Sequence, residues 1–297
     1  MVPASPYSCF PTAEQDAKAS TRCAATPQTQ SPSYRLAYAD NDFLTREELR
    51  PVRLQLELLK PELIQHELGI EATVVVFGGT RVPDEETARQ RFNKAEQEAA
   101  NEPLNPLVLR QVEIARRILA KSRYYEEARR LGQLLATTRH ARSGSRLVVI
   151  TGGGPGIMEA ANRGAHEAGE QTMGLNIVLP MEQAPNPYVT PELSFQFHYF
   201  SIRKMHFLMR AQALVAFPGG YGTLDELFET LTLIQTKKIR PVPVLLFGRE
   251  FWSKVINFDF LLEEGVIAPE DLDIFRYVET AEEAARIIAE HFNTTDR

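Results

Sequence analysis

From residue 72 onward, short apolar runs rich in β-branched residues alternate with longer segments of helical periodicity. The apolar runs predict buried strands at 72–77, 146–151, 172–178, 213–217 and 242–247, with a short final strand at 277–278. The periodic segments predict helices at 107–135, 157–168, 202–212, 224–236, 251–263 and 281–292. Such alternation indicates right-handed βαβ crossovers and a sheet covered on both faces. We therefore predict an α/β fold, a Rossmann-like doubly wound parallel sheet.

Composition and charge limit the classes of function that fit this chain. Of its 297 residues 43% are hydrophobic and 24% charged, as in ordinary globular proteins, and the net charge is −6. This acidic balance argues against a general nucleic-acid or membrane-surface partner. No apolar run reaches the roughly 18 residues of a membrane span. Its two cysteines, Cys9 and Cys23, suggest no disulfide framework or zinc site. We expect a cytoplasmic location.

The first part of the chain lacks the strand and helix alternation. Residues 1–33 are rich in Ser, Thr, Pro, Ala and Gln, so we expect a disordered tail without a secretory signal. A helical extension is predicted over 34–70, opened by a capping box at Thr45 and Glu48. This extension either packs on the core or serves assembly.

Prolines and charges add two local predictions. Pro51 and Pro61 are expected to break the extension into shorter helices. A single catalytic domain is predicted over 71–297. Within it, the highly charged segment 84–106 is either a solvated surface helix or a lid over a site.

The most specific motif lies between a predicted strand and a predicted helix. Residues 217–226 read FPGGYGTLDE. A glycine-rich turn at a helix N-terminus binds anions, because its backbone N–H groups point outward and the helix dipole favours negative charge. Glycines also let the backbone approach a phosphate closely. Glu226 lies just inside the helix, where a carboxylate weakens phosphate affinity, and so we expect it to have another task.

Two further motifs precede this loop, the pair Arg203-Lys204 and the sequence GGGPGIME at 152–159. Together the three motifs resemble the Lonely Guy family of cytokinin riboside 5′-monophosphate phosphoribohydrolases, formerly described as lysine decarboxylases. The resemblance runs from about residue 73 to residue 265. The segment 174–180 is similar to the longer bacterial branch of the family.

The resemblance implies an AMP nucleosidase-like hydrolase. It would cleave the N-glycosidic bond of AMP or N6-substituted adenosine 5′-monophosphates to the free base and ribose 5-phosphate. Arg203 and Glu226 are the implied catalytic pair, with no metal, no cofactor and a homodimer or larger homo-oligomer. The implied substrate-binding and phosphate-binding residues are Gly78, Gly79, Thr80, Gly153, Gly154, Met158, Glu159, Lys204, Gly219, Gly220, Gly222 and Thr223.

Several alternatives stay open at this point. The turn at 78–80 either lines a nucleotide pocket or is an ordinary strand end. Phe200-Ser201 stands where shorter plant members have Met-His, which leaves base specificity open. The pair Glu182-Gln183 either touches the ligand or does not, and His198 and His206 are better explained as packed or surface residues.

Three other kinds of protein compete with the hydrolase. A conventional NAD site fits poorly, because Pro155 removes a backbone donor and Asn176 stands where an acidic residue is expected. A non-catalytic nucleotide sensor on the same fold is the main alternative. Decarboxylation requires pyridoxal phosphate and a Schiff-base lysine, which no motif marks.

Overall fold

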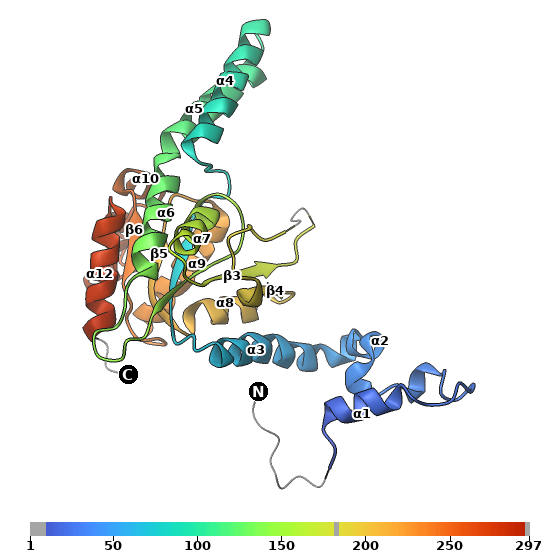
Figure 1. Ribbon diagram of the computed structural model, residues 1–297. Coiled ribbons are helices and arrows are strands. Elements are labelled where there is room, and N and C mark those ends of the chain that lie inside the picture. Colours follow the sequence, from blue (N-terminus) through green and yellow to red (C-terminus); the bar gives the residue numbers. More distant parts are fainter. Residues whose placement is uncertain (1–9, 181–183, 295–297) are drawn as a thin grey trace. The chain divides into compact units, whose positions relative to one another are not determined.

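The computed structural model describes residues 10–180 and 184–294, and its centre is a sheet of seven parallel strands (Figure 1). The spatial order is β4-β3-β2-β1-β5-β6-β7. The strands are β1 Ala72–Phe77, β2 Leu147–Thr151, β3 Thr172–Ile177, β4 Ser194–Phe197, β5 Ala211–Ala216, β6 Val244–Phe247 and β7 Phe275–Val278. Strands β1, β2, β3, β5 and β6 are buried along their whole length, as apolar runs in a sheet covered on both faces should be. The predicted doubly wound parallel fold is confirmed.

The chain winds outward from β1 in both directions. β1 pairs with β2 on one side and with β5 on the other, and the connections from β1 to β3 place their helices on the opposite face from the connections between β5 and β7. Phe77 and Ala216, at the ends of β1 and β5, are register partners. In open α/β sheets, ligands bind beyond the carboxyl ends of the strands at such a reversal point.

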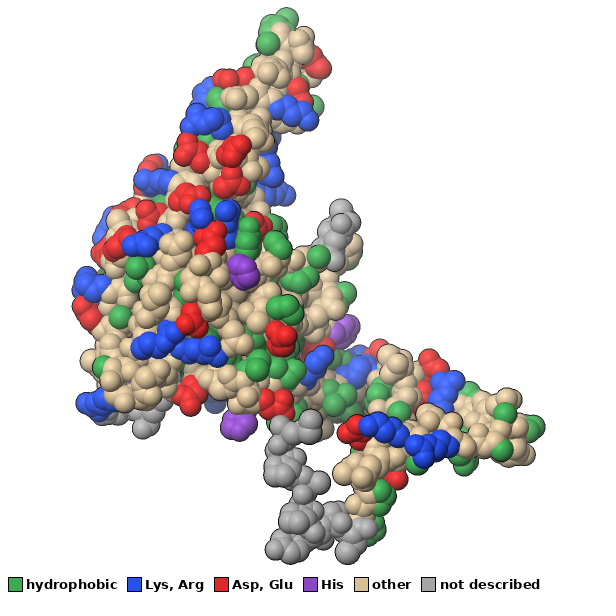
Figure 2. Space-filling view, viewed as in Figure 1, with side chains coloured by type: hydrophobic (Ala, Val, Ile, Leu, Met, Phe, Trp, Pro, Cys, Tyr) green, Lys and Arg blue, Asp and Glu red, His purple; other side chains and the backbone are tan. Residues whose placement is uncertain are grey.

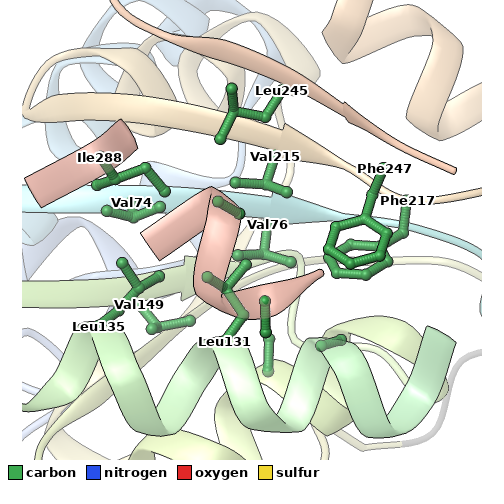
Figure 3. Packing of buried hydrophobic residues seen from close by; sticks show 14 of the residues in the cluster. Val74, Val76, Leu131, Leu135, Val149, Val215, Phe217, Leu245, Phe247 and Ile288 are labelled. Carbon is green, nitrogen blue, oxygen red and sulfur yellow. The ribbon is translucent and has the colours of Figure 1, made fainter. Parts of the chain in front are cut away.

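Two apolar layers cover the sheet, and alternate residues of one strand enter different layers. Val74 and Val76 join the layer beneath one group of helices, whereas Val75 and Phe77 join the other. This follows from the two-residue period of a strand. Figure 3 shows the layer that contains Val74 and Val76, in which the rings of Phe217 and Phe247 stack with centroids 4.3 Å apart.

Nine helices follow β1 within the described residues. They are α4 Glu85–Asn101, α5 Pro106–Lys121, α6 Arg123–Ala136, α7 Ile157–Glu167, α8 Phe200–Leu208, α9 Tyr221–Gln235, α10 Arg249–Val255, α11 Phe258–Glu263 and α12 Ala281–Thr294. Helices α6, α7 and α12 contribute to the layer with Val74, and α8, α9, α10 and α11 to the layer with Val75. No helix in the described ranges is both long and apolar enough to cross a membrane.

Two predicted helices are each divided into two. Segment 107–135 is interrupted at Ser122, whose hydroxyl donates to the Leu119 carbonyl oxygen at 2.7 Å. Segment 251–263 is interrupted before Asn257, whose side chain accepts from the backbone N–H of Phe260 and caps α11. Both side chains offer the backbone a local partner that competes with a continuous helix.

Other boundaries were also wrong. Helix α8 ends at Leu208, before the end of the helix predicted over 202–212, and Ala211 begins β5 instead. Strand β4 was not predicted. It has only four residues, which alternate between buried Phe195 and Phe197 and the more exposed Ser194 and Gln196, and it lies at the sheet edge beside β3.

The charged segment 84–106 contains the helix α4, which packs mainly against α5. Asp84 caps it by accepting from the backbone N–H of Thr87 at 2.9 Å. Figure 2 shows acidic and basic side chains interspersed over the surface of these two helices. The structure therefore favours a solvated helix over a lid.

Within the described residues, 10–63 form a separate compact unit, and the second unit begins at Ile64. The first unit contains α1 Ala13–Ser20, α2 Asn41–Leu44 and most of α3, Arg50–Glu67. It also has short 3₁₀ turns at Pro32–Tyr34, Ala37–Ala39 and Glu47–Leu49. Two more 3₁₀ turns, Pro191–Leu193 and Pro269–Ile274, belong to the second unit. Helix α1 lies in the range predicted to be disordered and buries none of its residues. The disorder and the domain limits remain predictions.

Two local predictions for the extension were wrong. Thr45 does not open a capping box, since it ends α2 and its hydroxyl donates to the Asn41 carbonyl oxygen. The prolines do not break α3 either. Pro51 is its second residue, where no intrahelical N–H bond is required, and Pro61 removes only one bond of a ladder that continues on both sides.

Candidate active site

A cavity of about 910 Å³ lies at the carboxyl ends of the central strands. Its walls come from the turns after β1 and β2, from α8 and from the start of α9. Among the predicted site residues, those that line it are Gly78, Gly79, Thr80, Gly154, Met158, Arg203, Gly220, Gly222, Thr223 and Glu226. Segments far apart in the sequence thus meet where strand order reverses, as such folds require.

The start of α9 forms one wall of the cavity. Gly219 has no room for a side chain, because an added Cβ would lie 2.1 Å from the Thr223 hydroxyl oxygen. At Gly220 and Gly222, in contrast, an added Cβ would meet open space. The first N–H groups of a helix have no intrahelical acceptor. The turn thus offers bare backbone donors and the Thr223 hydroxyl to a phosphate-sized group.

Glu226 lies on α9 beside this turn, and its residue surface is only 5% exposed. Burial raises the pKa of the Glu226 carboxyl to about 7. Lys204 and Arg203 oppose this shift, whereas Glu229 and Asp225 add to it. A carboxyl that titrates near neutral pH inside a cavity is suited to proton transfer or to charge stabilisation.

Arg203 is held from several sides. Its Nε donates to the Leu175 carbonyl oxygen at 2.8 Å, and its guanidinium lies 5.1 Å from the Phe207 ring centroid. A Cβ at Gly152 would come within 2.7 Å of Arg203 Nη2. The glycine after β2 therefore makes room for the guanidinium at the cavity wall.

Buried asparagines, which the sequence interpretation missed, support the turn after β2. Asn186 Nδ2 donates to the carbonyl oxygens of Gly153 and Gly154 at 3.2 and 3.1 Å. The same amide donates to Asn162 Oδ1 at 2.9 Å, and Thr151 Oγ1 donates to that oxygen at 2.7 Å. Buried amides of this kind are costly unless paired, so they fix one conformation of the turn. Asn162 could have been noticed in the sequence, because it is a polar residue on the otherwise apolar face of α7. Nothing in the sequence marks Asn186.

Comparisons with known proteins agree with these motifs. A family model described as "Possible lysine decarboxylase" matches residues 158–288. Cytokinin riboside 5'-monophosphate phosphoribohydrolase LOG3 of Arabidopsis thaliana is 29% identical over 148 residues, which cover 48% of this chain and 67% of that protein. The phosphoribohydrolase LOG7 of the same plant is 29% identical over 174 residues, 58% of this chain and 76% of that protein. The predicted resemblance to the Lonely Guy family is confirmed.

A solved structure is also similar to this chain. The Moco carrier protein from Chlamydomonas reinhardtii matches with a TM-score of 0.44 and 19% identity, over 76% of this chain and 99% of that one.

Four residues that the Lonely Guy resemblance implied do not line the cavity. Gly153 and Gly219 lie in its supporting turns. Glu159 accepts from the Tyr125 hydroxyl at 3.1 Å, at the contact of α6 with α7. Lys204 points to the acidic side chains of α9.

The cavity also has lining residues that were not predicted, namely Phe77, Gly152, Pro155, Ile177, Leu179, Ala184, Phe200, Tyr221 and Asp225. Neither His198 nor His206 lines it. His206 is buried against the Phe197 ring, and His198 lies edge-on to Tyr199. Residues 182–183, for which ligand contact was left open, lie outside the described residues.

Proposed function

We propose that this protein hydrolyses the N-glycosidic bond of purine nucleoside 5′-monophosphates, AMP or N6-substituted adenosine monophosphates. The observation that carries the proposal is Glu226, a buried carboxylate with a pKa near neutrality, which lines the same cavity as Arg203 and the glycine-rich turn at the start of α9. The relatives named phosphoribohydrolases support the same class of hydrolase.

The proposed chemistry follows from where the groups lie. The 5′-phosphate binds the start of α9, and the ribose lies over Glu226. As the bond between C1′ and the purine nitrogen breaks, positive charge develops on the sugar, by analogy with other glycoside hydrolysis. The carboxylate stabilises this charge and orients a water molecule toward C1′. The hydroxyl of water adds to C1′, and its proton ends on the departing purine.

Decarboxylation, which the description of the family model suggests, is less compatible with the cavity. A Schiff base requires an unprotonated lysine amine. Burial lowers the pKa of Lys204, but its contacts with Asp225 and Glu229 outweigh this effect and raise it overall. Lys204 is therefore held protonated, and it is a poor nucleophile.

The direct test is chromatography of the purified protein after incubation with AMP. We expect adenine and ribose 5-phosphate in equal amounts, and much less cleavage of adenosine, which lacks the anion that the start of α9 binds. Tight binding of AMP and of its N6-isopentenyl analogue, without product from either, would instead identify a nucleotide sensor.

The pH dependence of kcat/KM tests the role of Glu226. If the ionised carboxylate acts, kcat/KM rises with pH and levels off above an inflection near 7, because the pKa of Glu226 is about 7. An ordinary exposed carboxyl would give an inflection near 4.3. A decline above pH 7 in place of the rise would mean that Glu226 acts as the protonated acid.

A further inference from the structure

The neighbours Arg203 and Lys204 face different parts of the site. Successive helical residues point about 100° apart. Arg203 lines the cavity and lies against Gly152. Lys204 is absent from the cavity lining and reaches across to α9. The two cations therefore have different surroundings, although the motif presents them as one basic pair.

Lys204 is surrounded by carboxylates of α9. Its Nζ lies 2.8 Å from Asp225 Oδ2, 2.8 Å from Glu229 Oε2 and 3.7 Å from Glu226 Oε1. Its side chain is 16% exposed and that of Glu226 6%. An ammonium group has three donors. Two of them are directed to the flanking carboxylates, and the third side of the group faces Glu226.

Resting on the proposed function, we propose that Lys204 is a positioning residue, which holds Glu226 in place and favours its ionised form, and not a ligand of the substrate phosphate. Asp225 and Glu229 each hold the ammonium group at 2.8 Å, so its short contacts are with carboxylates of α9. Its charge offsets part of the cost of burying the Glu226 carboxylate. Phosphate binding is then left to the turn at the start of α9 and to Arg203.

The charged groups around Glu226 act in opposite directions. Lys204 and Arg203, both from α8, lower the pKa of Glu226, whereas Glu229 and Asp225, both from α9, raise it. Glu229 is one turn further along α9 and does not line the cavity. This gives a matched pair of substitutions, because Lys204→Met and Glu229→Gln should move the ionisation of Glu226 in opposite senses.

The experiment compares pH profiles of kcat/KM for wild type, Lys204→Met, Lys204→Arg and Glu229→Gln. We expect the acid limb of Lys204→Met to move up by roughly one pH unit, the size expected of an opposite charge within about 4–6 Å. At pH 7 its kcat/KM falls several-fold and recovers above pH 9. Lys204→Arg should stay close to wild type, and Glu229→Gln should move the limb down. Loss of kcat/KM for Lys204→Met at every pH, with KM raised and the limb unmoved, would make Lys204 a phosphate ligand and overturn the proposal.

A second measurement separates this proposal from the proposed function. Infrared difference spectra between wild type and Glu226→Gln follow the carboxyl stretch of Glu226 during a pH titration, without any turnover. The pH at which this stretch titrates should be higher in the Lys204→Met background than in wild type, by the same amount as the acid limb. If the protein cleaves no nucleotide but shows this shift, the proposed hydrolase activity is disproved and the proposed role of Lys204 is supported. An unchanged titration would disprove the role of Lys204 alone.

Discussion

Replacement of Glu226 by Gln should lower kcat by roughly 10²–10⁴-fold, the usual contribution of a group that acts on protons or charge in the transition state. Gln has nearly the same size and keeps one oxygen, but it carries no charge and accepts no proton. The anion site at the start of α9 remains. Binding of AMP, measured by calorimetry, should therefore change much less than kcat.

The folding of this variant provides an internal control. Because the pKa of Glu226 is raised from 4.5 to about 7, wild type loses stability as the pH rises through this window, by about 3 kcal/mol in total. Gln does not titrate. At pH 8 the variant should be at least as stable as wild type in denaturant unfolding, and this difference should shrink toward pH 4. Turnover that survives the substitution would remove Glu226 from the mechanism.

The second large effect is expected on stability. At Gly164 in α7, an added Cβ would lie 1.8 Å from the Arg129 carbonyl oxygen of α6. At Gly132 in α6, it would lie 2.2 Å from the Ala161 carbonyl oxygen of α7. The two helices thus meet backbone to backbone. Gly164→Ala must push them apart, and we expect a loss of about 3 kcal/mol or more in the free energy of unfolding.

Thermal unfolding followed by circular dichroism measures this loss. For a domain of this size, 3 kcal/mol corresponds to a decrease in Tm of roughly 6–12 °C. Gly169→Ala is the matched control. Gly169 has φ +79°, yet a Cβ there meets nothing within 4 Å, so only about 1 kcal/mol of backbone strain is expected. Equal Tm values for the two variants would mean that α6 and α7 separate without cost.

The sequence predicted the centre of the fold because that part is governed by local patterns. Residues 73–76 form a continuous β-branched run, and they make up the middle of the strand β1. The glycine-rich turns follow strands, and parallel strands end on one edge. The hydrogen bond between Gly79 and Pro218, in the turn before α9, therefore followed from topology alone.

What escaped prediction depends on partners from distant segments. Asn186 supports a turn more than thirty residues earlier in the chain. Lys204 was predicted among the residues that bind substrate or phosphate, and its three acidic neighbours are revealed only where α8 meets α9. The short edge strand β4 has too few residues for its alternation to be distinguished from a loop. Such features arise from tertiary contacts that no local pattern encodes.

The central position of β1 also affects how the chain must assemble during synthesis. β1 ends at Phe77, but its neighbour β5 does not begin until Ala211. Until β5 has left the ribosome, one apolar edge of β1 has no strand to pair with, and unpaired edges invite association between chains. We therefore expect nascent chains that stop before β5 to depend on chaperones.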